Sequence, residues 1–296
     1  FLATRPGQQR IGGVGGWAEG DAKFAGANPQ GGAVITYYQR TRHLFGPIKL
    51  EILDAKGQVI DTIPASKRRG INRVGWSMRV APPRAPKAAQ AAFNAAQGPR
   101  VVPGTYTVRL TKGKQTYETK LEIGLDRRAA YTVAERQAQF DAAMQVHGLF
   151  GQMSGLVDRI GFARMMADQI GASLPQGDKL RGELATFSAA ADEVRKKIVA
   201  TKEGGAITGE LRLREHTDEL YGALMGYEGR PGDYQVARIG VLRDELAAIN
   251  ASFDKLTGTS LPKINEQLKT RGLPPIGPPP QAAAPASANV SSADMQ

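Results

Sequence analysis

Hydrophobic and polar residues alternate over much of the first 125 positions, and this period of two predicts β-strands. The clearest stretch is Pro47–Ile63, in which Ile48, Leu50 and Ile52 alternate with charged residues. Residues 54–57 place Asp first and Gly fourth, which suits a tight turn because glycine adopts the left-handed conformation at little cost. The stretch therefore predicts a β-hairpin.

Further short strands are predicted at residues 32–39, 70–80, 104–111 and 115–123, which are rich in β-branched and aromatic side chains. With the hairpin, this makes at least six strands separated by turn signals. Such a series is typical of a β-sandwich and not of an α/β sheet. Residues 31–125 are therefore predicted to form an antiparallel sandwich.

After Asp126 the apolar residues recur about every 3.5 positions, which predicts helices. Thr132 and Glu135 have the spacing of a capping box at the start of a long helix. Gly148, Gly151 and Gly155 lie within this helix and predict a kink or a close approach of another helix, since glycine is costly inside helices.

Three more helical stretches follow, together with a short last one. The second has the regular apolar spacing of a helical bundle, the third is expected at 208–225 and the fourth at 236–256, and Pro262 is expected to start a short helix that ends at Lys269. An antiparallel bundle of about four helices is the simplest packing. The second apolar stripe consists of Leu180, Leu184, Phe187, Ala191, Val194 and Ile198.

The predicted fold class is therefore α+β, with an immunoglobulin-like sandwich at 31–125 and a helical bundle at 126–272. Residues 1–30 are rich in glycine and are expected to extend over a neighbouring domain or chain, with Trp17 and Phe24 as anchors. Residues 273–296 are a Pro/Ala-rich tail that must lie along a partner if it is ordered. Because the sequence starts at Phe1 without an initiator Met, we expect a processed piece or an excerpt of a longer protein.

A Pro/Ala-rich insertion at 81–103 interrupts the predicted sandwich. Its length and prolines exclude a central strand, and its middle, at 87–97, is suited to a short helix. We predict that it is an interaction loop; the alternative is a tolerated insertion at the end of a sheet. The candidate contact residues are Arg84, Lys87, Phe93 and Arg100.

The net charge of +11 is concentrated in the first part of the chain. Residues 1–125 contain 19 Lys and Arg against 7 Asp and Glu, whereas residues 126–296 contain 20 against 21. Such a surplus attracts anionic polymers, acidic proteins or membrane surfaces, unless the side chains are merely solvated. Lys67, Arg68 and Arg69 form a compact basic cluster that suits phosphate or carboxylate groups; the alternative is an ordinary solvated turn.

Catalytic chemistry has little support in the sequence. There is no cysteine, and the three histidines lack the spacing of a metal site or a catalytic triad. The best candidate is a metal-assisted hydrolase site around Glu215, His216, Asp218 and Glu219, but a half site of this kind needs ligands from another helix. We therefore expect no enzyme activity, no cofactor, no nucleic-acid binding and no transmembrane segment.

Five aromatic residues of the predicted strands suggest a second hypothesis. Trp76, Tyr37, Tyr38, Tyr106 and Tyr117 could stack on sugars if their rings were exposed. Because they alternate with aliphatic residues, the alternative is that they belong to the core.

The β region resembles the immunoglobulin-like module of the flagellar hook-capping type. The motifs are an apolar strand, Asp-x-x-Gly turn and apolar strand at Ile48–Ile60, Gly-x-Asn-x-x-x-Trp at Gly70–Trp76, and Pro-Gly-x-Tyr within Pro103–Leu110. With residues 24–38 and DELAAINASFDKL at 244–256, the chain also resembles the C-terminal region of exported bacterial proteins with sortilin-like, neuraminidase-repeat (BNR) β-propellers.

This resemblance implies export to the periplasm or the cell exterior. Any activity would reside in a propeller N-terminal to Phe1, and the present chain would be a non-catalytic accessory module for protein contacts. The implied partner is a β-propeller domain or chain, or else an acidic protein surface or an anionic glycan. The alternative is a carbohydrate-binding accessory region of a glycoside-hydrolase-like propeller protein.

Overall fold

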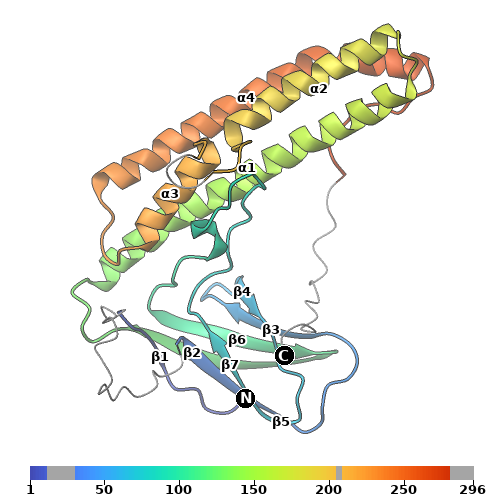
Figure 1. Cartoon of the computed structure of the whole chain (residues 1–296). Helices are drawn as coiled ribbons and strands as arrows, with labels where there is room; N and C mark the ends of the chain where they lie inside the picture. Colours follow the sequence, from blue (N-terminus) through green and yellow to red (C-terminus); the bar gives the residue numbers. More distant parts are fainter. Residues whose placement is uncertain (12–30, 205–208, 281–296) are drawn as a thin grey trace, which may run out of the picture.

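The computed structural model describes residues 1–11, 31–204 and 209–280 and has an α+β fold. The sheets lie on one side of the molecule and the helices on the other (Figure 1). The segment that follows β5 rises from the sheets to the helices, and α1 starts next to the end of β7. The region that joins the two parts is therefore formed by two separate portions of the chain.

Two sheets make up the β region. In the larger, five strands have the order β1-β7-β6-β3-β4, in which β1 runs parallel to β7 and the other neighbours are antiparallel. In the smaller, β2 and β5 form an antiparallel pair. The strands span β1 Gly7–Gln9, β2 Ala33–Gln39, β3 Ile48–Leu53, β4 Val59–Ile63, β5 Gly70–Trp76, β6 Gly104–Lys112 and β7 Gln115–Leu125.

The predicted hairpin is confirmed as β3 and β4. Asp54 Oδ1 accepts hydrogen bonds of 2.9 Å from the backbone N–H groups of both Lys56 and Gln58. Gly57 has a φ of +77°, as the turn requires. The other four predicted strands are also present, with ends that differ by a few residues.

The two sheets share one hydrophobic core. Trp76 is fully buried, its ring meets the edge of Tyr106 at a centroid distance of 5.5 Å, and its indole N–H donates to Asp61 Oδ2 at 3.0 Å. Because the ring packs against Tyr106 and its N–H has an acceptor, burial of the indole leaves no hydrogen-bond donor unpaired. Other buried members of the core are Ile35, Tyr37, Leu50, Ile52, Val108, Leu110, Leu121 and Ile123.

The N-terminal segment belongs to the chain's own β region. Gly7 in β1 is in register with Ile123 of β7. Next to β2, the backbone N–H of Leu2 donates to Thr36 O at 3.0 Å, and the Phe1 ring packs edge-on against Tyr37. Residues 1–11 thus pack on both sheets of the same chain, and packing of the 1–30 segment on a neighbouring domain or chain stays a prediction. The predicted anchors Trp17 and Phe24 lie outside the described residues.

Four helices form the other part: α1 Val133–Ser173, α2 Lys179–Ile198, α3 Leu213–Met225 and α4 Asp233–Thr270. The predicted capping box is confirmed, because Thr132 Oγ1 accepts from Glu135 N–H and the Glu135 carboxylate accepts from Thr132 N–H. All six residues of the predicted α2 stripe are buried in a hydrophobic cluster shared by the four helices. The third helix starts at Leu213, later than predicted.

The predicted short last helix is wrong, since α4 continues through Pro262 to Thr270. Proline within a helix removes one backbone hydrogen bond and costs about 3 kcal/mol. Ile264 and Leu268, beyond the proline, are buried in the helical cluster. Burial of these two side chains offsets the cost, since each contributes about 1.5–3 kcal/mol.

Two other expectations for the helical part also need correction. A Cβ atom added at Gly148, Gly151 or Gly155 would meet nothing within 4 Å, so these glycines mark no close approach, and the kink stays a prediction. The first residues of the predicted tail pack on the chain itself: Ile276 is buried, and its backbone N–H and C=O both bond to the side chain of Asn265.

The glycines provide a test of the packing. At Gly98, a Cβ would lie 1.9 Å from Val80 O, so Gly98→Ala should destabilise the protein by about 3 kcal/mol. Gly148 lies exposed within α1, and Gly148→Ala should instead stabilise by about 0.5–1 kcal/mol. Urea unfolding measures both. Equal effects of the two substitutions would contradict the close approach at Gly98.

Candidate functional site

The 81–103 segment contacts the helices of the same chain. Ala85, Ala88 and Ala92 pack against the helical cluster, and Ala95 is buried in it. The helix predicted at 87–97 is reduced to one 3₁₀ turn, η1 Asn94–Ala96. Backbone groups of this segment bond to the helical part instead, for example Ala89 N–H to Ala200 O at 3.2 Å. The contact surface predicted here is thus at least partly occupied within the chain.

Asp218 of α3 holds the tip of this segment. Its Oδ1 accepts from Ala95 N–H at 2.8 Å, and its Oδ2 accepts from the backbone N–H of Asn94 at 3.3 Å and from Asn94 Nδ2 at 3.2 Å. A carboxylate that accepts several N–H bonds fixes the backbone that donates them. The Asp218 carboxylate therefore anchors η1 to α3.

Glu215, one turn earlier in α3, also serves the structure. Its Oε1 pairs with Arg214, whose Nε lies 2.7 Å away, and both side chains are almost fully buried. Arg214 Nη2 in turn donates to Gln90 O in the 81–103 segment at 2.8 Å. Oε2 accepts from Arg212 N–H at 3.2 Å and so caps α3.

The proposed hydrolase cluster is thus divided between two environments. Asp218 binds the 81–103 segment directly and Glu215 only through Arg214, whereas His216 Nδ1 and Glu219 Oε2 lie 3.6 Å apart on side chains that are 35% and 63% exposed. In the part of the chain that the structure describes, no three His, Cys, Asp or Glu side chains come together as metal ligands would. The arrangement offers no site where these four residues act on one substrate.

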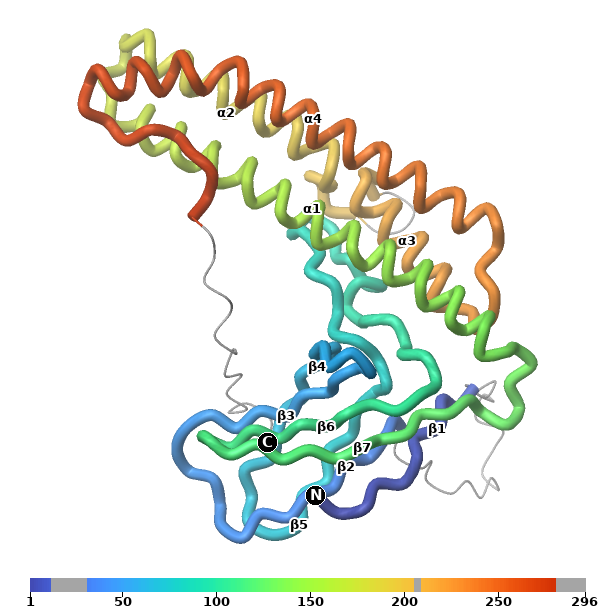
Figure 2. The backbone as a smooth tube through the Cα atoms, turned by 180° about the vertical axis from the view of Figure 1, so that it is seen from behind, coloured from blue at the N-terminus to red at the C-terminus, as the bar shows by residue number. Residues whose placement is uncertain are grey.

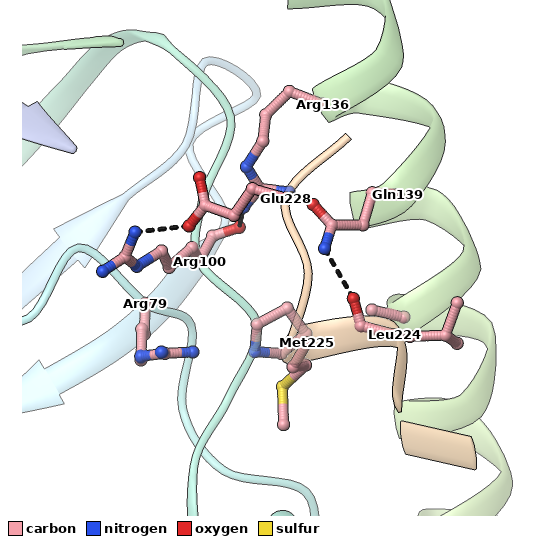
Figure 3. A pocket seen from close by; sticks show the side chains of 9 residues that line it. Arg79, Arg100, Arg136, Gln139, Leu224, Met225 and Glu228 are labelled. Atoms are coloured by element: carbon pink, nitrogen blue, oxygen red, sulfur yellow. Dashed lines mark hydrogen bonds and ion pairs between the residues drawn. The ribbon is translucent and has the colours of Figure 1, made fainter. Parts of the chain in front are cut away.

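An arginine cluster, formed by Arg79, Arg100 and Arg136, lies where the helices meet the sheets (Figure 3). Arg136 of α1 is 3% exposed and donates to Arg100 O at 2.5 Å and to Gln139 Oε1 at 2.8 Å. Glu228 pairs with Arg100 and accepts from the Tyr131 hydroxyl.

The electrostatics of the arginine cluster indicate a structural role. Burial lowers the pKa of Arg136 and of Arg79, although an arginine stays charged at neutral pH. Burial, with the neighbouring Glu228 carboxylate, raises the pKa of Tyr131 to about 12. The cavity between these residues measures about 10 Å³, room for about one water molecule. This cavity is too small for a substrate molecule.

The candidate contact residues of the insertion are separated in the structure. Arg84 forms an ion pair with Asp158 of α1, and Arg100 belongs to the arginine cluster. Lys87 is exposed, and Phe93 is 81% exposed beside η1. Lys87 and Phe93 are thus the two of these four residues that face solvent and take no part in the ion pairs just described.

A polar groove of about 770 Å³ lies between the N-terminal segment and β2. We call it the N-terminal groove. Its described wall residues include four arginines, Arg5, Arg10, Arg73 and Arg100, of which Arg100 is also paired with Glu228, and no carboxylate occurs among these described residues. The sequence hypotheses missed Arg5, Arg10 and Arg73, because these residues are far apart in the chain. Only the overall surplus of basic residues signalled such a site.

The predicted basic cluster lies at one end of the sheets. Lys67, Arg68 and Arg69 are exposed in the loop between β4 and β5, beside the loop between β2 and β3. The backbone N–H of His43 donates to Lys67 O at 3.0 Å and so joins the two loops.

The aromatic residues divide between core and surface. Trp76, Tyr37 and Tyr106 are buried and cannot stack on a sugar. Tyr38 and Tyr117 are 58% and 46% exposed, but they lie in different sheets. A flat platform of several rings is therefore not formed by these five residues.

The comparisons with known proteins do not place the chain in a family: no family model, curated protein or solved structure matches it. None of the described helices has a stretch suited to spanning a lipid bilayer.

Asp218→Asn should loosen the 81–103 segment, because the amide that replaces the carboxylate is uncharged and accepts at only one of its two positions. We expect a loss of about 1–3 kcal/mol in stability and faster tryptic cleavage after Lys87. Glu219→Gln is the matched control, since that side chain is 63% exposed. Unchanged cleavage in Asp218→Asn would show that the anchor is dispensable.

His147 of α1 gives a pH test of the same junction. Its Nε2 lies 3.1 Å from Ala81 O, and burial lowers its pKa below the ordinary value of 6.5. Because the unfolded chain then binds a proton that the folded chain does not, stability should fall as the pH drops below 6.5 toward the folded-state pKa. Urea unfolding at about pH 7.5 and about pH 5.5 should show a smaller difference for His147→Gln than for the unmodified protein. Equal differences would refute this role.

Proposed function

We propose that this protein is a non-catalytic binding and assembly module that recognises an acidic segment of a partner protein. The observation that carries the proposal is the N-terminal groove, whose described lining has four arginines and no carboxylate. Guanidinium groups bind carboxylates through paired, charge-assisted hydrogen bonds, so an Asp- or Glu-rich strand or loop suits this groove.

We further propose that the β region is an immunoglobulin-like sandwich. In such sandwiches strands G, F and C are neighbours in one sheet, and strands B and E are in the other. With β2 taken as strand B, the neighbours β7, β6 and β3 correspond to G, F and C, and β5 corresponds to E. This strand order supports the assignment.

A side-chain contact also supports it. The Tyr106 hydroxyl, near the start of β6, donates to Val102 O at 2.7 Å, four residues upstream. This resembles the tyrosine corner of immunoglobulin-like domains, which lies at the start of strand F. For the helical part we propose an antiparallel bundle, since α1 to α4 contribute to one shared hydrophobic cluster.

We also propose that the module is the C-terminal part of an exported β-propeller protein. The support is the resemblance of residues 24–38, 48–110 and 244–256 to such proteins. Ala3 and Thr4 line the N-terminal groove, so a domain joined ahead of Phe1 would start beside it. We therefore propose that the groove holds a preceding propeller. Fractionation of cells that make the protein tests the proposed export.

The alternative function, carbohydrate binding, has one favourable observation, the exposed rings of Tyr38 and Tyr117. An anionic glycan could also meet the arginines of the N-terminal groove. The experiment must therefore separate acidic peptide from glycan.

The test compares binding of a fluorescent oligoglutamate peptide with binding of heparin fragments and a neutral oligosaccharide. We expect the peptide to bind in a salt-sensitive way, with affinity about tenfold weaker in the double variant Arg5→Ala, Arg73→Ala. The matched control removes two exposed arginines elsewhere, Arg127→Ala and Arg230→Ala.

Three results would contradict the proposal: no peptide binding, equal weakening by the control pair, or binding of heparin alone. Binding of the neutral oligosaccharide, lost on Tyr38→Ala or Tyr117→Ala, would favour the carbohydrate alternative. Circular dichroism and urea unfolding establish that each variant is folded before it is compared.

A further inference from the structure

Three connections meet at one end of the two sheets. They are the β2–β3 loop at residues 40–47, the β4–β5 loop at 64–69 and the β6–β7 turn at 112–115, and we call them together the basic end. Backbone hydrogen bonds join them: His43 N–H to Lys67 O at 3.0 Å, and Gly113 N–H to Pro47 O at 3.1 Å. Figure 2 shows the β2–β3 loop curving past the tip of the β6–β7 hairpin, away from the helices.

The charge of this end has one sign. The three connections contain seven Lys and Arg and no Asp or Glu. The basic residues come from all three connections, so the charge is spread over the end and does not belong to one loop. Six of the seven basic residues are exposed, and Lys112 is partly buried. The seven are Arg40, Arg42, Lys67, Arg68, Arg69, Lys112 and Lys114.

Two large apolar residues stand at the tip of the β2–β3 loop. Leu44 is 66% exposed and Phe45 is 87% exposed. The loop that carries them is held in place, because His43 is buried and its Nε2 lies 2.9 Å from Gly46 O. The two side chains therefore project from a fixed base and do not line a groove.

We propose that the basic end docks on a lipid bilayer that contains anionic headgroups, with Leu44 and Phe45 inserted between the lipids. An apolar tip on an end that carries cationic side chains matches both layers of such a surface, since the tip enters the acyl boundary while the charges stay at the headgroups. This surface is separate from the N-terminal groove and does not depend on the acidic partner proposed above.

A bilayer suits the tip better than an acidic protein does. A protein partner would need a matching pocket for a Leu-Phe pair on a convex loop, together with carboxylates on all sides of that pocket. A bilayer offers depth for apolar groups and a continuous anionic plane at any orientation. The apolar interior and the anionic plane of a bilayer can both be used without a surface shaped to fit this chain.

Vesicle sedimentation with the full chain tests this proposal. We expect binding to vesicles of phosphatidylcholine mixed with phosphatidylglycerol, little binding to phosphatidylcholine alone, and weakening by added salt. Leu44→Ser with Phe45→Ser should weaken binding at least tenfold. Replacing Lys67, Arg68 and Arg69 by Ala should weaken it about fivefold for each residue removed.

Matched variants separate insertion at this end from general stickiness. Phe93→Ser removes an aromatic residue of similar exposure outside the basic end, and alanine at Lys255, Lys263 and Lys269 removes three exposed charges from α4. These variants should bind the vesicles as the unmodified chain does. Because the Leu44 and Phe45 side chains are exposed, their replacement should also leave urea unfolding unchanged.

Several results would overturn the proposal. One is equal binding to both kinds of vesicle; another is unchanged binding in the Leu44→Ser, Phe45→Ser variant. Weakening of equal size in the control variants, or binding of heparin without binding of vesicles, would do so too, and the latter would assign the basic end to a soluble polyanion.

Discussion

The carboxylate of Asp218 connects the two halves of this protein. It accepts the backbone N–H groups of η1, and this turn belongs to a segment that starts and ends in the sheets. That segment enters both hydrophobic cores, with Ala95 in the helical one and Val101 in that of the sheets. Buried polar anchors of this kind are costly to break, because the freed donors find no water. The orientation of sheets and helices therefore depends on hydrogen bonds as well as on apolar contact.

Elements with a local, regular pattern could be predicted from the sequence. The β3–β4 hairpin and the apolar stripe of α2 depend on period and turn chemistry, and both were located closely. β1 escaped prediction because three residues carry no period, and its pairing with β7 joins positions more than a hundred residues apart. Pro262 led to the opposite error: it predicted a helix boundary, but α4 continues through it because Ile264 and Leu268 are buried beyond it.

The candidate sites could be predicted only in part, for the same physical reason. Residues 67–69 are adjacent in the sequence, which is why they could be named as a basic cluster, whereas the basic residues of the 40–47 and 112–115 connections join them only through strand topology. The carboxylates of α3 suggested a catalytic site because the sequence does not show which hydrogen-bond donors they contact. Asp218 and its donor Ala95 are 123 residues apart in the chain. Buried Arg136 and Arg214 likewise follow from tertiary packing alone.

The parallel pairing of β1 with β7 has a mechanical consequence. In a parallel pair, the start of one strand and the end of the other lie at opposite ends. Tension applied between Phe1 and the start of α1 would therefore pull β1 and β7 lengthwise past each other, which loads all their hydrogen bonds at once instead of opening them one by one. The short strand β1 would thus be loaded in shear by such a force.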